Sequence, residues 1–151
     1  MKIMSALILP ALLMAAASCT GPRNDYSDFT PLPADGWLYG DTIVFTPEIT
    51  DSIADGELSV AVCHDSDYPY SNLWLEVSFP AGAGSIHRDT IEMQLADPYG
   101  HWLGKGLGTG HQMQRTLPGR IRLHRGTRVS VRHIMRLDTL RHIRQVGITF
   151  Q

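Results

Sequence analysis

Several segments of this sequence contain residue types that carry catalysis in other proteins, and each lacks a part that the chemistry needs. Residues 82–87 (GAGSIH) resemble the turn that presents a nucleophilic serine, but His87 stands where that turn needs glycine. Residues 100–106 (GHWLGKG) have the glycines and the lysine of a phosphate-binding loop, but no Ser or Thr follows Lys105. We therefore expect neither a serine hydrolase nor a nucleotide-binding site.

The histidines, acids and cysteines form no recognisable metal or catalytic motif. The chain has 7 His, but it contains neither HExxH nor CxxC. Asp65 and Asp67 could act as an acid–base pair, yet the Tyr68-Pro69 that follows them is typical of a loop. Cys63 follows a run of apolar residues, which favours a buried thiol over a nucleophile. The sequence predicts no enzyme, no catalytic residue, no metal and no cofactor, and a small-molecule ligand is not expected.

Residues 1–18 have the three parts of a secretory signal peptide. Lys2 precedes an apolar run, and small residues precede Cys19. Pro10 interrupts the run, which is shorter than the roughly 20 residues that a membrane-spanning helix needs. Small residues just before a cysteine are typical of a lipobox, so we expect Cys19 to carry lipid that anchors the protein in a membrane. The alternative is a plain secreted protein.

The mature chain is predicted to consist of a tether and one domain. Residues 19–34 are rich in Pro, Gly, Asp and Ser and have no periodicity, which favours a flexible tether that starts at the lipidated Cys19. Residues 35–151 alternate short apolar runs of period two with turn residues, the pattern of an all-β domain. We expect a single antiparallel β-sandwich, jelly-roll or Ig-like, of about eight strands. The candidate strands lie at 42–46, 58–63, 73–79, 91–95, 111–117, 119–124, 129–131 and 146–150, and one turn of helix is expected within 136–145.

Charge is unevenly distributed along the chain. Fourteen of the 15 acidic residues lie between positions 19 and 97, whereas ten basic residues and one acid follow. Either the two halves interleave and pair their charges, or the second half forms a basic face that binds an anionic envelope ligand such as peptidoglycan or lipopolysaccharide. The candidate basic face comprises Arg120, Arg122, Arg128 and Arg132. Nucleic acid is not expected as a partner, because no aromatic residues are interleaved with the arginines.

Two loops, at 65–73 and 97–108, are rich in aromatic residues and glycine. Asp97-Pro98-Tyr99-Gly100 fits a type I turn, and Trp102 could pack beneath the loop that follows it. Alternatively, exposed aromatic side chains in a long loop can contact a protein partner. The candidate contact residues are Tyr68, Tyr70, Asn72, Asp97, Tyr99, Trp102 and Lys105.

These loops resemble those of the GldH family of gliding-motility lipoproteins from Bacteroidetes. The similarity includes YPYSNL at 68–73, WLGKG at 102–106 and DGW at 35–37, and it spans roughly residues 25–151. The resemblance implies a non-enzymatic envelope lipoprotein that supports the gliding machinery, which in that phylum is linked to type IX secretion. It also implies other envelope proteins of that machinery as partners. Thr20 after Cys19, and the sparse acids that follow, favour the outer membrane with the domain facing the periplasm.

Overall fold

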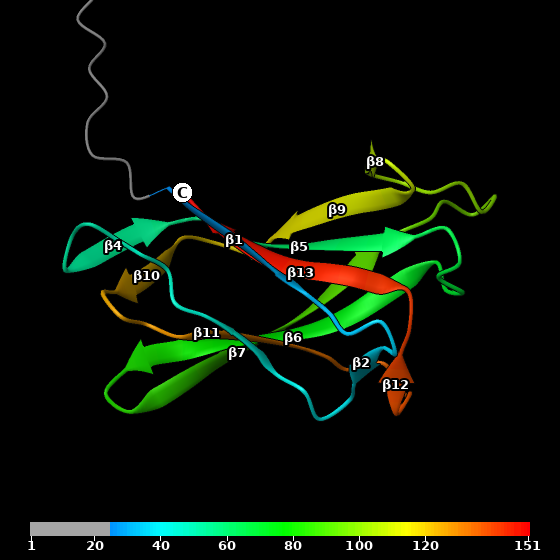
Figure 1. Ribbon diagram of the computed structural model, residues 1–151. Helices are drawn as coiled ribbons and strands as arrows, with labels where there is room; N and C mark the ends of the chain where they lie inside the picture. The colour runs from blue at the N-terminus through cyan, green and yellow to red at the C-terminus, as the bar shows by residue number, and fades with distance from the viewer. Residues whose placement is uncertain (1–24) are drawn as a thin grey trace, which may run out of the picture.

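The computed structural model describes residues 25–151, which form two antiparallel sheets packed face to face. A five-stranded sheet with the order β1-β13-β5-β9-β8 lies over a four-stranded sheet with the order β3-β11-β6-β7 (Figure 1). Two short ribbons, β4–β10 and β2–β12, lie at opposite ends of the sandwich (Figure 1). The predicted all-β sandwich is confirmed.

The strand bounds are as follows. The five-stranded sheet consists of β1 (Tyr26–Pro31), β13 (Ile143–Phe150), β5 (Leu58–Asp65), β9 (Gly110–Thr116) and β8 (Lys105–Leu107). The four-stranded sheet consists of β3 (Ile43–Phe45), β11 (Val129–His133), β6 (Asn72–Gly82) and β7 (Ser85–Gln94). The ribbons are β4 (Ile53–Gly56) with β10 (Ile121–His124), and β2 (Trp37–Leu38) with β12 (Thr139–Leu140).

The core lies between the two sheets and follows from the period-two pattern. On β6, Leu75 and Val77 are fully buried, while Glu76 between them points away from the core. Strand β5 is buried along its whole length. One side faces the core, and longer side chains of the neighbouring strands, such as Gln114, reach across the small residues of the other side. Fully burying one such aliphatic side chain stabilises the fold by about 1.5–3 kcal/mol. The largest fully buried side chains are Trp37, Phe45, Phe150, Leu58, Leu73, Leu75, Met93, Leu95, Leu117, Leu123, Leu140 and Ile148.

The boundary of the domain differs from the prediction. Residues 26–31 were expected to belong to a flexible tether, but they form β1, which pairs with β13 along its full length. The sheet therefore begins at Tyr26, not at Asp35. The strand is polar and ends in Pro31, which an edge strand tolerates because it pairs on one side only. The signal peptide, Cys19 and residues 20–24 lie outside the described residues.

The strand count also exceeds the expected eight. Each predicted strand is present, and the additional ones are β1, β2, β4, β8 and β12. The expected turn of helix within 136–145 is wrong, since that segment forms β12 and the start of β13, with a bulge between Ile143 and Gln145. Within residues 25–151, no helix is long and apolar enough to cross a membrane.

Candidate functional site

The two aromatic loops meet at the end of β5, around the fully buried ring of His64. The ring of Trp102, from the loop before β8, lies edge-on to it at 4.6 Å between centroids. Tyr68, from the loop after β5, lies at 5.7 Å, and His111 of β9 stacks on it at 5.4 Å. We call these four residues the ring cluster. Because it contacts both loops, the ring cluster fixes their positions relative to the sheet.

His64 is neutral in this position. Its Nδ1 lies 2.9 Å from the backbone carbonyl oxygen of Asp65, which can only accept a hydrogen bond, so Nδ1 carries the proton. The other ring nitrogen has no hydrogen-bond partner among the described residues. Burial lowers the pKa of His64, because a charged ring would lose its hydration there. The buried neutral ring of His64 thus packs between the two loops.

The second loop is held by its own hydrogen bonds around Asp97. The carboxylate of Asp97 accepts hydrogen bonds from the backbone amides of Tyr99 and His101, each at 2.9 Å. The ring of His101 donates a third bond to it, also at 2.9 Å. Hydrogen bonds from His101 lower the pKa of Asp97. This turn presents Tyr99 with 88% of its surface exposed.

The candidate contact residues divide into two groups. Tyr68 is buried and donates a hydrogen bond to the carbonyl of Asn72, while the side chain of Asn72 bonds to Glu92 on β7 at 2.7 Å. Trp102 is partly buried in the ring cluster, and Asp97 holds the turn. These four residues therefore position the loops. The residues that remain exposed at the surface are Tyr70, Tyr99 and Lys105.

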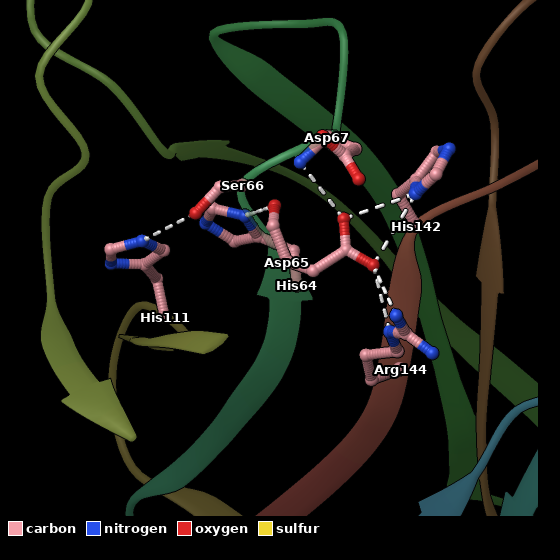
Figure 2. Close-up of polar contacts among 7 residues, drawn as sticks. All are labelled: His64, Asp65, Ser66, Asp67, His111, His142 and Arg144. Carbon is pink, nitrogen blue, oxygen red and sulfur yellow. Dashed lines mark hydrogen bonds and ion pairs between the residues drawn. The ribbon is translucent and has the colours of Figure 1, made fainter. Parts of the chain in front are cut away.

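On the opposite face of β5, the Asp65 carboxylate holds the start of β13 in place (Figure 2). One carboxylate oxygen accepts hydrogen bonds from Arg144 at 2.8 and 2.7 Å, and the other faces the Nδ1 of His142 at 3.0 Å. The backbone amide of Asp67 donates a hydrogen bond to the Asp65 oxygen that faces His142. Burial acts to raise the pKa of Asp65, but these donors outweigh it and hold that pKa below its usual value. The carboxyl group is therefore ionised and fully paired.

Two cavities flank the turn between β12 and β13. One, of about 330 Å³, is lined by Leu32 and Pro33 on one side and by Arg141 and Arg144 on the other. The second, of about 310 Å³, lies between Tyr70 and the same turn. Both border His142, which adopts a left-handed conformation with φ of 71°.

Metal binding is the first chemistry that this region suggests. Asp65, Asp67 and His142 offer ligand atoms within 4.8 Å of one another. However, Arg144 already neutralises Asp65, and its positive charge opposes a cation.

Nucleophilic catalysis is less well supported. Ser66 and His111 lie 3.4 Å apart, longer than a nucleophile–base contact normally is, and no third described residue hydrogen-bonds to His111. Cys63 is a free thiol and is buried as predicted, and its burial raises its pKa, which disfavours the reactive thiolate.

Basic residues of the second half of the chain pair with acidic residues of the first half. Arg122 of β10 binds Asp55 of β4 at 3.0 Å, and Arg132 of β11 binds Glu76 of β6 at 2.9 Å. The interleaving alternative is thus confirmed. The candidate basic face does not lie on one sheet, because β10 pairs with β4, whereas β11 lies between β3 and β6. Of the remaining candidates, Arg120 donates to the carbonyl oxygen of Asp55, and Arg128 is exposed.

A family model described as GldH lipoprotein matches residues 24–150, the whole sandwich from β1 into β13. The chain belongs to the GldH lipoprotein family. It is 35% identical over 74 residues to the gliding motility lipoprotein GldH homolog of Christiangramia forsetii, covering 48% of this chain and 44% of that protein. It is 27% identical over 101 residues to the gliding motility lipoprotein GldH of Flavobacterium johnsoniae, covering 67% of this chain and 61% of the relative.

The resemblance drawn from the loops is confirmed by this membership. As a GldH-family lipoprotein, the chain is associated with the cell envelope. The matches span less than two thirds of the length of either relative. They therefore support the family assignment but do not identify binding partners. Within the match, the ring cluster and the group formed by Asp65, Asp67, His142 and Arg144 lie on opposite faces of the end of β5.

Proposed function

We propose that this lipoprotein is a non-enzymatic accessory component of the gliding-motility and type IX secretion machinery. In this proposal, lipid on Cys19 anchors it in the outer membrane, with the domain in the periplasm. It binds other envelope proteins through the exposed residues Tyr70, Tyr99 and Lys105, which we call the contact residues. The observation that carries the proposal is the position of these residues relative to the anchored end of β1.

The strand register supports the placement of the contact residues at the end of the sandwich opposite Tyr26. Tyr26, the first residue of β1, lies opposite Phe150, which in turn lies opposite Leu58 at the start of β5. His64 follows six residues further along β5, about 20 Å away at the rise of an extended strand. The seven residues from Cys19 to Tyr26 reach at most about 25 Å. The anchor therefore keeps the Tyr26 end near the membrane, and the contact residues project from the other end.

The rigidity of the loops supports the same role. An exposed aromatic side chain binds a protein with less loss of entropy when its loop is already ordered. The ring cluster and the Asp97 turn provide that order for Tyr70 and Tyr99. The ring of Tyr70 packs against that of Tyr68 at 5.6 Å, so the buried ring supports the exposed one.

The non-enzymatic part of the proposal is supported by how the titratable groups are used. His64 is buried, and Asp65 is paired with Arg144. Ser66 with His111 is the nearest approach to a nucleophile and base at this end of the described chain. Replacement of Ser66 by Ala should therefore leave gliding and secretion unchanged in cells. Loss of either phenotype at normal protein levels would contradict this part of the proposal.

Site-specific photo-crosslinking in cells tests the contact residues. A photoreactive phenylalanine analogue at Tyr70 or Tyr99 should capture envelope proteins of the machinery, identified by mass spectrometry. The matched control position is Ile86, which is 55% exposed and lies near the β6–β7 hairpin at the anchored end of the sandwich (Figure 1). Equal capture from Ile86, or no capture from either tyrosine, would contradict the assignment of the contact end.

Localisation has its own test. The native lipoprotein should sediment with outer-membrane fractions and resist protease added to intact cells. Cys19→Ala should release it into the soluble fraction. Digestion in intact cells would indicate the cell surface and contradict the periplasmic orientation.

A further inference from the structure

The outward face of the five-stranded sheet carries no charged side chain over three successive rows of residues on β1, β13, β5 and β9. The Asp65–Arg144 ion pair lies beyond the third row, at the end of β5. Directly opposed residues of antiparallel strands share a face, so the register assigns this face row by row. The first row contains only hydroxyl side chains: Ser27, Thr149, Ser59 and Thr116. The second row is Phe29, Gly147, Ala61 and Gln114, and the third is Pro31, Gln145, Cys63 and Gln112. We call this surface the amide face; the first charged group beyond it in the third row is Lys105 of β8.

The other sheet shows that this lack of charge is specific to one face. Its outward surface carries the Arg132–Glu76 ion pair, with Arg88 and Glu92 on the neighbouring strand β7. Both surfaces belong to one chain in which 19% of the residues are charged. Solubility alone does not explain why the outward face of one sheet carries charges along its strands while these three rows of the other carry none.

The aromatic ring of Phe29 packs against the amide face. A Cβ atom at Gly147 would come within 2.5 and 2.6 Å of two ring carbons of Phe29, so the ring packs directly on the backbone of β13. This contact is possible because Gly147 has no side chain. Phe29 remains partly exposed on its outward side.

Hydrogen-bonding groups surround that ring. Gln114 reaches across β5 to the hydroxyl of Thr149 at 3.1 Å, since Ala61 beneath it is small. The hydroxyls of Ser59 and Thr116 bond to each other at 2.8 Å. The carboxamides of Gln112 and Gln145 have no hydrogen-bond partner among the described residues, and each offers two donors and one acceptor.

We propose that the amide face binds an uncharged glycan chain that carries N-acetyl groups. Neutral amides and hydroxyls lose less free energy than charges when a ligand removes their water, and sugar hydroxyls and N-acetyl amides restore their hydrogen bonds. The exposed side of the Phe29 ring provides an apolar platform for the C–H groups of a sugar ring. Because β1 directly follows the anchored segment, the face stays close to the envelope layer where such polymers lie. This function does not involve Tyr70 or Tyr99, and of the contact residues only Lys105 borders the amide face.

Titration with defined oligosaccharides tests the proposal. The full-length lipoprotein is purified in a polyoxyethylene detergent, which contains no sugar, and is titrated calorimetrically with chitohexaose and with cellohexaose. Chitohexaose should bind saturably at concentrations up to about 1 mM, and more tightly than cellohexaose, which lacks N-acetyl groups. Phe29→Leu keeps an apolar side chain over Gly147 but removes the ring, and should weaken binding about tenfold. Gln145→Glu, which adds charge at constant size, should weaken it similarly.

A matched control and a cellular measurement complete the test. Trp74→Leu alters an exposed aromatic residue on the charged face of the other sheet and should leave the affinity unchanged. Thermal unfolding of each variant verifies that it is folded. The proposal is overturned if chitohexaose does not bind, if both sugars bind equally, or if Trp74→Leu reduces binding as much as Phe29→Leu. Photo-crosslinks from Gln145 in cells that capture a protein instead of a glycan would also overturn it.

Discussion

The ring of Trp102 packs edge-on against the ring of His64 with 4.6 Å between their centroids, which joins the loop before β8 to the central strand of the larger sheet. This contact is the base of the loop that presents Tyr99. Trp102 also forms an isolated bridge with Ala96, so the loop is closed at its neck. Removing the indole should therefore affect loop order and global stability together.

Trp102→Ala should lower the free energy of unfolding by about 2–4 kcal/mol, because it leaves a cavity beside the buried His64. Urea denaturation followed by circular dichroism measures this change. Tyr99→Ala is the matched control, since Tyr99 is 88% exposed and its loss should change stability by less than about 0.5 kcal/mol. Similar losses for both variants would show that Trp102 does not brace the loop.

Stability should decrease as the pH falls below the ordinary histidine value of 6.5. His64 and His133 are both fully buried, and each has one ring nitrogen without a partner among the described residues. Burial lowers both pKa values, so the unfolded chain binds more protons than the folded one below pH 6.5. The stabilisation is complete above 6.5 and decreases until the pH reaches the lowered folded pKa values.

Urea titrations at several pH values between 8 and 5 measure that slope. His64→Phe keeps a ring of similar size and removes one titrating group, so its slope should be shallower than that of the unmodified protein. His133→Phe should reduce the slope as well, because burial also lowers the pKa of His133. The ring of His133 bonds to the carbonyl of Trp37 through one nitrogen, and its other nitrogen has no partner among the described residues. An unchanged slope in His64→Phe would mean that His64 is not a source of the pH dependence.

Asp65 should account for a separate loss of stability at lower pH. Its pKa is held below the ordinary value of 3.8, so the stabilisation is present above 3.8 and is lost as the pH falls through the folded pKa. Asp65→Asn should cost about 2 kcal/mol at pH 7, since it removes charge-assisted bonds to Arg144 and His142. The variant should also lose less stability than the unmodified protein between pH 4 and 2. Acid unfolding curves of the two proteins measure both effects.

The sandwich was predictable because its long strands each bury one side against the core. Alternation of the apolar Leu75, Val77 and Phe79 with the polar Glu76 and Ser78 is by itself enough to indicate a strand with one buried side. Strand β1 gives no such signal, because it lies at an edge and its sequence, YSDFTP, is polar and ends in proline. Residues 26–31 form a strand because their backbone pairs with β13. The N-terminal boundary was therefore predicted too late in the sequence.

The candidate site was only half predictable for a similar reason. The amino-acid composition indicates the two aromatic loops, and the spacing of Asp97, Pro98 and Gly100 indicates the turn. His64 and Asp65 lie on opposite faces of one strand, but their partners come from segments far away in the sequence: Trp102 on one side and Arg144 on the other. Arg144 was assigned to a helical turn, because three-residue spacing of apolar residues also occurs by chance in a short irregular segment. The amide face depends on the register of four strands, which sequence alone does not give.

A matched pair of glycines tests whether the loop after Trp102 is held against β9. Gly100 and Gly104 both have φ of 85°, but a Cβ at Gly100 would meet open space, whereas one at Gly104 would lie 2.2 Å from the carbonyl oxygen of Gln112. Gly100→Ala should cost about 1 kcal/mol from backbone strain alone. Gly104→Ala adds a backbone collision and should cost about 3 kcal/mol or more. Urea denaturation measures the difference; equal costs would show that the loop moves freely away from β9.

Truncation tests whether β1 belongs to the folded domain. A chain that begins at Asp25 retains β1 and should unfold at the same urea concentration as the mature lipoprotein. A chain that begins at Asp35, the boundary that composition suggests, loses β1 and exposes the edge of β13 to solvent. It also uncovers Gly147 and removes Tyr26, which packs against the core. An unpaired edge strand is prone to pair with other chains, so the shorter protein should be less stable by several kcal/mol and should aggregate on size-exclusion chromatography. Identical midpoints and elution for the two chains would mean that β1 is dispensable.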